Sequence, residues 1–189
     1  MNKILAGALF AAVMVSTACS SNANKLAKQA KEANPAPCPN IIVLSDAARL
    51  IEFDGEQRLD DVAYSGEIID VTMSCRYFGD RPIEMSIDVD FAFGKGPKGA
   101  DGQKIFKYFV AVTRKDIEVI AKKEFLVPVD FKEDRIVVTL TEEIDKIVIP
   151  RKAEETSGLN FEIIVGFALT SKQVIYNRSG KSLKFPNMQ

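Results

Sequence analysis

Histidine and tryptophan are absent from this chain, and cysteine occurs only three times in its 189 residues. Without histidine, neither a Ser-His-Asp nor a Cys-His arrangement can be assembled, and no imidazole can ligate a metal. Without tryptophan, the core signature of antibody domains is missing, as is the best stacking surface for a sugar. These absences leave carboxylates as the main candidates for any catalysis.

A charge excess of either sign is also missing. The chain has 25 basic and 26 acidic residues. Removing residues 1–18 would remove only Lys3 from this total, leaving 24 basic and 26 acidic residues and a net charge of 24 − 26 = −2. Because nucleic-acid affinity depends on neutralising many phosphates, this balance gives no reason to expect a nucleic-acid partner.

Only one apolar run is long, and it lies at the N-terminus. Ile4 to Val15 follows Lys3 without a break. The run has the length of a signal-peptide core and is too short to span a bilayer. Small residues at 16–18 then precede Cys19. This segment, residues 1–18, resembles a bacterial lipoprotein signal peptide, and the resemblance implies that Cys19 becomes the acylated N-terminus. Ser16 stands where that family usually has an aliphatic residue, so plain secretion is the alternative.

The three cysteines divide naturally into one and two. They are Cys19, Cys38 and Cys75. An exported chain with an unpaired thiol is anomalous, whereas acylation of Cys19 leaves two cysteines that can pair. No C-x-x-C motif is present, and an oxidising envelope favours a structural bridge. The sequence therefore predicts a Cys38–Cys75 disulfide and membrane lipid as the partner of Cys19.

Residues 19–37 are predicted to be the lipidated cysteine and a flexible tether. The stretch 25–33 has high helix propensity but few apolar residues with which to dock. Residues 34–37 include two prolines, which favour extended backbone. Lys25, Lys28 and Lys31 could contact anionic lipid, but a solvated linker is the favoured interpretation of these residues. Ser20, rather than aspartate, follows Cys19, which favours the outer membrane, facing the periplasm.

The remainder, 38–176, shows the period-two alternation of β-strands. The clearest case is Ile69 to Phe93, two alternating runs joined by a polar turn at 78–82. Cys75 falls on the apolar phase of the first run. A phase switch near 66–69 indicates a bulge. Other strand candidates lie at 41–44, 105–112, 116–131, 134–140 and 161–169, with a possible extension through 174–176, and the tail 177–189 looks loose.

This pattern predicts an all-β domain. About eight short-spaced strands with almost no helix favour an antiparallel two-sheet sandwich of immunoglobulin-like or fibronectin-like type, with a β-barrel as the alternative. The glycine-rich stretch 94–104 lacks the P-loop spacing and is interpreted as a flexible hairpin connection.

Acidic residues supply the only candidates for a metal site or for catalysis. Asp70, Asp88 and Asp90 form one such group, and residues 142, 143 and 145 form another. They could ligate Ca²⁺ or act on glycosides, but a solvated polar face explains them as well. We therefore expect no catalytic residue, no metal and no cofactor.

Residues 38–176 also resemble the folded part of alphaproteobacterial lipoproteins of unestablished activity. The resemblance rests on the Cys38-Pro39 start, the run 41–44, the stretch 47–53 and the long strand reaching Cys75. It implies an envelope location. We expect a non-enzymatic lipoprotein that displays its sandwich to a protein partner through the 94–104 loop and exposed Phe106 and Tyr108. A carboxylate hydrolase or carbohydrate-active module is the alternative.

Overall fold

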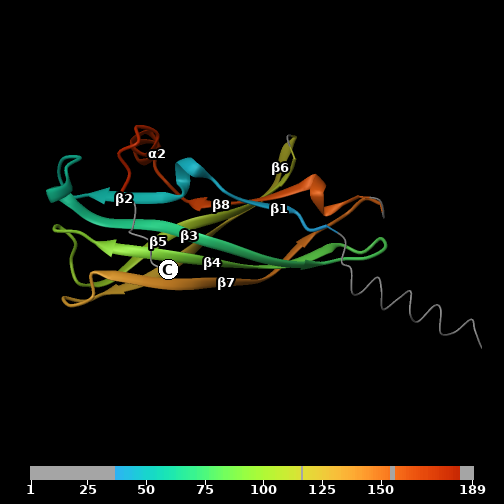
Figure 1. Cartoon of the computed structure of the whole chain (residues 1–189), viewed down its shortest axis with the longest axis horizontal. Helices are drawn as coiled ribbons and strands as arrows, with labels where there is room; N and C mark the ends of the chain where they lie inside the picture. The colour runs from blue at the N-terminus through green and yellow to red at the C-terminus, as the bar shows by residue number, and fades with distance from the viewer. Residues whose placement is uncertain (1–36, 116, 154–155, 184–189) are drawn as a thin grey trace, which may run out of the picture. The chain divides into compact units, whose positions relative to one another are not determined.

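A computed structural model describes residues 37–115, 117–153 and 156–183. These described residues form one compact unit with its own hydrophobic core (Figure 1). Its eight strands are β1 (Asn40–Val43), β2 (Arg49–Phe53), β3 (Val62–Arg76), β4 (Ile83–Lys95), β5 (Gly102–Arg114), β6 (Glu118–Phe131), β7 (Val137–Ile149) and β8 (Phe161–Phe167). They form two four-stranded sheets, ordered β1-β8-β5-β6 and β2-β3-β4-β7. Over the described residues the two-sheet sandwich is confirmed, and the sheets do not close into a barrel.

The β3–β4 hairpin supplies the two central strands of one sheet. It pairs antiparallel from Tyr64 opposite Lys95 to Arg76 opposite Glu84. Alternate β4 side chains are almost completely buried between the sheets, as the alternation predicts: Ile83, Met85, Ile87, Val89, Phe91 and Phe93. Phe91 and Phe93 contact Phe167 of the opposite sheet, with ring centroids 5.6 and 6.0 Å apart. The central core is therefore a layer of aromatic rings between the two sheets.

The predicted bulge in β3 is confirmed, but the burial predicted for one residue beside it, Ile69, is wrong. The β3–β4 register shifts between Ile68 and Asp70. Ile68 is buried, whereas Ile69 is 47% exposed because it is the extra residue at the bulge. The prediction that Ile69 begins the buried phase is thus wrong, and the odd-numbered phase faces inward only from Val71 onward.

The connection between β4 and β5 is not a hairpin. β4 pairs with β3 and β7, whereas β5 pairs with β6 and β8 in the other sheet. Residues 96–101 therefore cross from one sheet to the other, which corrects the interpretation of 94–104 as a hairpin connection. Phe106 and Tyr108 are 2% and 0% exposed, so their predicted role as surface contacts is wrong.

The chain also changes sheets between β1 and β2. β1 pairs parallel with β8, and the short 3-10 helix η1 (Ser45–Ala47) leads into β2, which pairs antiparallel with β3. The long strands β6 and β7 are the edges on the other side. Each side of the sandwich thus has two edge strands, one from each sheet, that are consecutive in the chain: β1 and β2 on one side, β6 and β7 on the other.

A helix follows β8 where the sequence analysis expected more strand and a loose tail. α2 (Ser171–Arg178) has a capping box, in which Thr170 accepts from the Gln173 backbone and the Gln173 side chain accepts from Thr170. Asn177 Nδ2 donates to the carbonyls of Asp46 and Arg49, each at 2.8 Å. The prediction that 174–176 extend a strand is therefore wrong, and ordered structure continues through Arg178.

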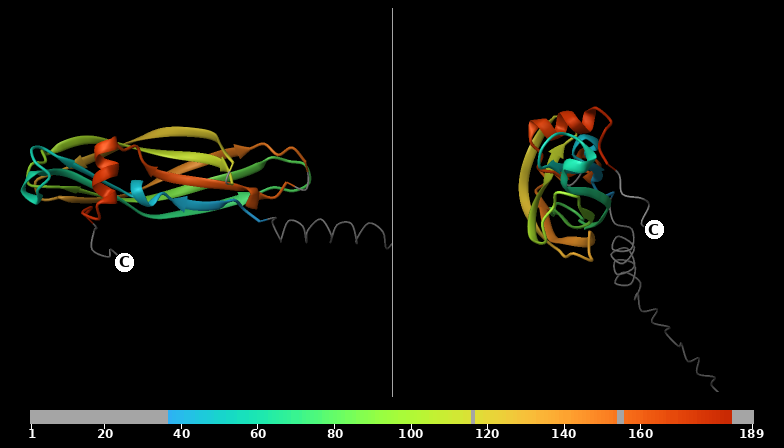
Figure 2. Two further views of the ribbon diagram at one scale, coloured as in Figure 1. Left: turned by 90° about the horizontal axis from the view of Figure 1, so that it is seen from above. Right: turned by 90° about the vertical axis from the view of Figure 1, so that its left-hand side faces the viewer.

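The strands run lengthwise along this unit, so that it has two ends (Figure 2). Among the described residues, no helix has the length and apolarity needed to cross a bilayer. One end carries Pro37, the turn after β3 and the segment after β7; the other carries the turn after β2, the 96–101 crossover and the turn after β6 (Figure 1). We call the first the tether end and the second the distal end.

Candidate functional site

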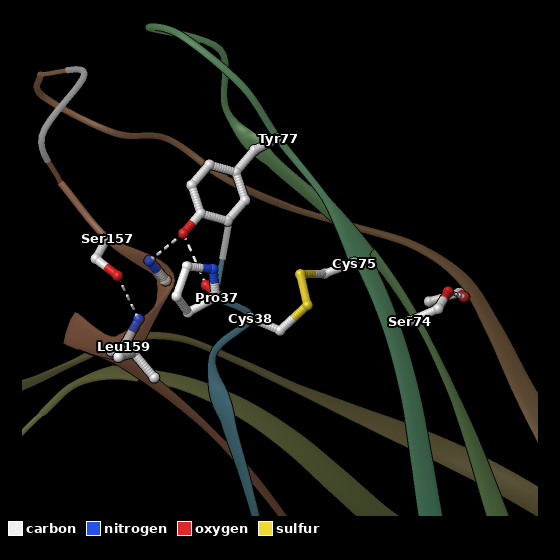
Figure 3. The surroundings of a disulfide bond; sticks show 9 residues. Pro37, Cys38, Ser74, Cys75, Tyr77, Ser157 and Leu159 are labelled. Atoms are coloured by element: carbon white, nitrogen blue, oxygen red, sulfur yellow. Dashed lines mark hydrogen bonds between the residues drawn. A yellow bond between two sulfur atoms is a disulfide. The ribbon is translucent and has the colours of Figure 1, made fainter. Parts of the chain in front are cut away.

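The predicted disulfide lies at the tether end. Cys38 and Cys75 are bonded, with their Cα atoms 5.9 Å apart (Figure 3). Cys38 leads into β1 of one sheet, and Cys75 lies in β3 of the other. The bond therefore joins the two sheets at the point where the described chain begins. Cys75 is half-buried rather than fully buried.

Tyr77 makes a second connection beside the disulfide. Its hydroxyl donates to the Pro37 carbonyl at 2.7 Å and accepts from the Gly158 backbone N–H at 2.7 Å (Figure 3). A side chain at position 158 would overlap the Pro37 carbonyl oxygen, so this close approach requires glycine. One buried hydroxyl thus joins the start of the described chain, the end of β3 and the segment before β8.

Arg151 ties the surrounding turns to Tyr77. Its Nε donates to the Arg81 carbonyl at 2.7 Å and its Nη1 to the Thr156 carbonyl at 3.0 Å. Nη2 donates to the Gly79 carbonyl, and the guanidinium lies 4.5 Å from the centroid of the Tyr77 ring. We call the set Pro37, Cys38, Cys75, Tyr77, Arg151 and Gly158 the tether junction. It fixes where the chain leaves the sandwich.

Only part of this junction is predictable from the amino-acid sequence. The cysteine pair was predicted, and Tyr77 was assigned correctly to the buried phase. Nothing in the sequence singled out Arg151 or Gly158, because both lie in a polar stretch. Arg151 donates to backbone carbonyls, which no residue type marks, and Gly158 bonds to a tyrosine 81 residues away. Cys19 and the lysines at 25, 28 and 31 lie outside the described residues.

The carboxylate groups do not form a metal centre. Asp70 lies opposite Asp90 in the β3–β4 pairing, and Asp88 lies opposite Glu143 of β7. Asp90 Oδ1 accepts a hydrogen bond from Thr141 at 2.5 Å. Within the described ranges, no group of three or more acidic or cysteine side chains is placed to hold a metal ion.

A hollow of about 770 Å³ between the end of β2 and α2 is lined by two other carboxylates, Glu52 and Glu56. Glu52 is 2.6 Å from Lys104 Nζ, and Glu56 is 3.7 Å from Arg58 Nε. Each of the two carboxylates therefore has a cationic partner on the same surface.

Tyr108 is the one described side chain with a strongly shifted pKa. Burial raises the pKa of its hydroxyl to about 12, and the nearby Glu142 carboxylate adds to the shift. Tyr108 Oη has no hydrogen-bond partner among the described residues. A phenol with this pKa stays protonated at neutral pH, and its closed apolar surroundings give a substrate no access.

The chain was compared with models of protein families and with curated proteins, and neither comparison found a match. Among the described residues, the tether junction is the best-defined candidate site, and its contacts hold the chain together. It combines a covalent bond, a bridging hydroxyl and a guanidinium that donates to three backbone carbonyls in two loops.

Proposed function

We propose that this chain is a non-enzymatic envelope lipoprotein, anchored by an acylated Cys19, which displays its β-sandwich to a protein partner. The proposed location is the outer membrane, facing the periplasm. The tether junction marks the membrane-proximal end of the sandwich. The distal end, with the 96–101 crossover, is the proposed contact surface for the partner.

The division of the cysteines carries this proposal. The structure pairs Cys38 with Cys75, which leaves Cys19 as the remaining cysteine of the chain. Cys19 directly follows three small residues and the apolar run Ile4–Val15. An exported protein rarely keeps an odd thiol, and acylation explains both its presence and its position. Several acyl chains on one residue give stable anchoring, because each buried CH₂ contributes about 0.8 kcal/mol.

The position of Pro37 supports the same arrangement. Residues 20–36 separate Cys19 from it, which is 36 − 19 = 17 residues. A flexible chain of this length has a root-mean-square span of roughly 20–25 Å and a limit of about 60 Å. The tether would therefore hold the tether end close to the headgroups while leaving the sandwich outside them.

The distal end would then lie well away from the membrane. β3 runs from Val62, which contacts the 96–101 crossover, to Arg76, just before Tyr77. Its 15 residues correspond to about 45 Å. Lys98 is exposed in that crossover. A loop held at this distance from the anchor is accessible to another envelope protein.

The test is to express the full chain and a Cys19→Ser variant in a bacterium and to separate membranes from soluble protein. We expect the wild type in the outer-membrane fraction with an acylated Cys19. The variant should remain unprocessed or lose that modification, because the acyl acceptor is gone. Cys38–Cys75 bonding, read from mobility without reductant, should be the same in both.

Release of wild-type protein as a soluble species with an unmodified Cys19 would contradict the anchoring. A disulfide-linked dimer through Cys19 would then be the expected alternative. Because the two proteins differ by one atom of one side chain, misfolding of the sandwich does not explain a difference in their location.

A further inference from the structure

A cationic hollow lies beside the tether junction. It has a volume of about 310 Å³ and lies between the β5–β6 turn and the segment that follows β7. Its basic lining residues are Arg114, Lys115 and Lys152. The Lys115 backbone N–H donates to the Asn160 carbonyl at 2.9 Å, which joins the two walls. The hollow is therefore part of the tether end of the sandwich.

The remaining walls of the hollow are largely apolar. They include Pro150, Ile117 and Phe161. Phe161 is buried, whereas Ile117 is 71% exposed at the tip of the β5–β6 turn. Cations beside an exposed apolar side chain match a ligand that has an anionic head and an apolar body. A membrane lipid has this combination, and a small inorganic anion has only the first part.

The described side chains that line this hollow include three cations and no carboxylate. Arg114 forms an ion pair with Glu118 at 3.3 Å, which neutralises part of its charge. Neither Lys115 nor Lys152 forms an ion pair within the described ranges. Asp116, Glu154 and Glu155 flank the hollow in the sequence and lie outside those ranges. The two lysines are therefore the cations to test.

The position of the hollow indicates where the anion would come from. Thr156 and Asn160, which line it, flank the Gly158 that contacts Tyr77 and approaches Pro37. The chain leading to Cys19 thus departs from the same end, with 17 residues between Cys19 and Pro37. The proposed anchor, on a tether of this length, would keep this end near the bilayer surface, so that the effective concentration of lipid headgroups around the hollow is high.

We propose that this hollow binds the headgroup of an anionic lipid in the bilayer surface, with Ile117 entering the interface beside it. Lys115 and Lys152 would attract the phosphate, and Ile117 would add apolar contact. The sandwich would then lie with its tether end against the membrane rather than moving freely on its tether. The inference extends the proposed anchoring, but binding by the hollow does not require Cys19.

The test uses residues 36–189, the compact unit that contains the core and the disulfide. This protein lacks Cys19 and the tether lysines, so acylation and the lysines at 25, 28 and 31 cannot contribute. Binding is measured by co-sedimentation with vesicles of phosphatidylcholine alone and with vesicles that also contain phosphatidylglycerol. We expect binding only to the second kind, weakening as salt is added.

Variants then assign the binding to the hollow. Each basic residue near an anionic surface contributes about fivefold in affinity, so Lys115→Gln with Lys152→Gln should weaken binding about 30-fold. The matched control changes two exposed lysines elsewhere, Lys98→Gln with Lys172→Gln, and should leave binding within about twofold. Ile117→Ser should cost about fivefold. Its matched control is Ile175→Ser, because Ile175 is 67% exposed on α2.

Three outcomes would overturn the inference. The first is equal binding to both kinds of vesicle, or binding to neither. The second is a control pair as damaging as the hollow pair. The third is saturable binding of inorganic phosphate without vesicle binding, which would assign the hollow to a soluble anion. None of these outcomes concerns Cys19, whose acylation is read separately by mass in the full chain.

Discussion

The two ends of the sandwich are both held by a tyrosine hydroxyl, but they are built differently. At the tether end, Tyr77 bridges Pro37 and Gly158 beside the Cys38–Cys75 bond. At the distal end, the Tyr64 hydroxyl bonds to both the carbonyl and the N–H of Ala100, each at 3.0 Å. No disulfide is present among the described residues of the distal end.

The distal end relies on close backbone packing instead. The Gly96 N–H donates to the Ala63 carbonyl at 2.8 Å, and the Lys98 N–H donates to the Val62 carbonyl at 3.0 Å. A side chain at position 96 would overlap the Val62 carbonyl oxygen. The disulfide is thus found at the tether end, where the proposed tether would attach. Close backbone packing is found at the distal end, which is the proposed contact surface for a partner.

Removing the disulfide should have the largest effect on stability. The bond closes a loop with a sequence separation of 37, for which the chain-entropy relation gives about 4 kcal/mol. The double variant Cys38→Ala, Cys75→Ala of residues 36–189 should lose about that much in free energy of unfolding, measured by denaturant titration. A loss below about 1 kcal/mol would show that the non-covalent contacts alone hold the tether end.

Gly96→Ala should be the most damaging single change at the distal end. The new methyl group would meet backbone rather than a movable side chain, so the crossover must shift and its bonds to β3 weaken. We expect a loss of about 2–3 kcal/mol by the same titration. Lys98→Ala, in the same loop, is the control and should change stability by less than about 0.5 kcal/mol. Similar values for both would refute the packing argument.

The two bridging tyrosines should differ in the cost of losing their hydroxyl. Tyr77→Phe leaves the buried Gly158 N–H without its acceptor and should cost about 1–3 kcal/mol. Tyr64→Phe should cost about 1 kcal/mol or less, because its bonds to Ala100 are exposed and water can replace them. Equal losses in the free energy of unfolding would mean that burial of the bonded groups does not make the Tyr77 hydrogen bonds more stabilising than those of Tyr64.

Tyr108, buried between the two ends, provides the smallest effect at neutral pH. Its hydroxyl lacks a partner among the described residues, so Tyr108→Phe should be neutral or stabilising by up to about 1 kcal/mol. Because burial raises the folded-state pKa to about 12 from 10.0, the unfolded chain ionises first. Wild-type stability should therefore fall from about pH 10 to pH 12, and the part due to Tyr108 should be absent in Tyr108→Phe. An identical alkaline loss in both proteins would contradict the assignment.

The fold was predictable where one phase of a strand was uniformly apolar. In β4 every second residue from Ile83 to Phe93 is apolar, and all are buried. β5 was ambiguous because both phases carry large apolar residues, with Ile105 exposed and Phe106 buried. The phase there is set by pairing with β6 and β8, which are distant in the sequence. Placing Phe106 and Tyr108 on the surface was the result of that ambiguity.

Strand order and the candidate site were harder to predict from the sequence. The glycines at 94–102 suggested a hairpin turn, whereas Gly96 serves close packing of a crossover between sheets. α2 did have a local signal, the Thr170-x-x-Gln173 capping pattern, which was outweighed by the apolar stretch 174–176. Cysteine parity predicted the disulfide, but the partners of Tyr77 and Arg151 are backbone groups that no residue pattern marks.

We infer that the three cysteines divide into an acylated anchor, Cys19, and a structural pair, Cys38 and Cys75. The most direct measurement is the mass of the N-terminal peptide of the full chain, purified from bacterial membranes without reductant. We expect this peptide to begin at Cys19 and to carry lipid, and Cys38 and Cys75 to be recovered as one disulfide-linked species. An N-terminal peptide with unmodified Cys19, or Cys19 bonded to another cysteine, would contradict it.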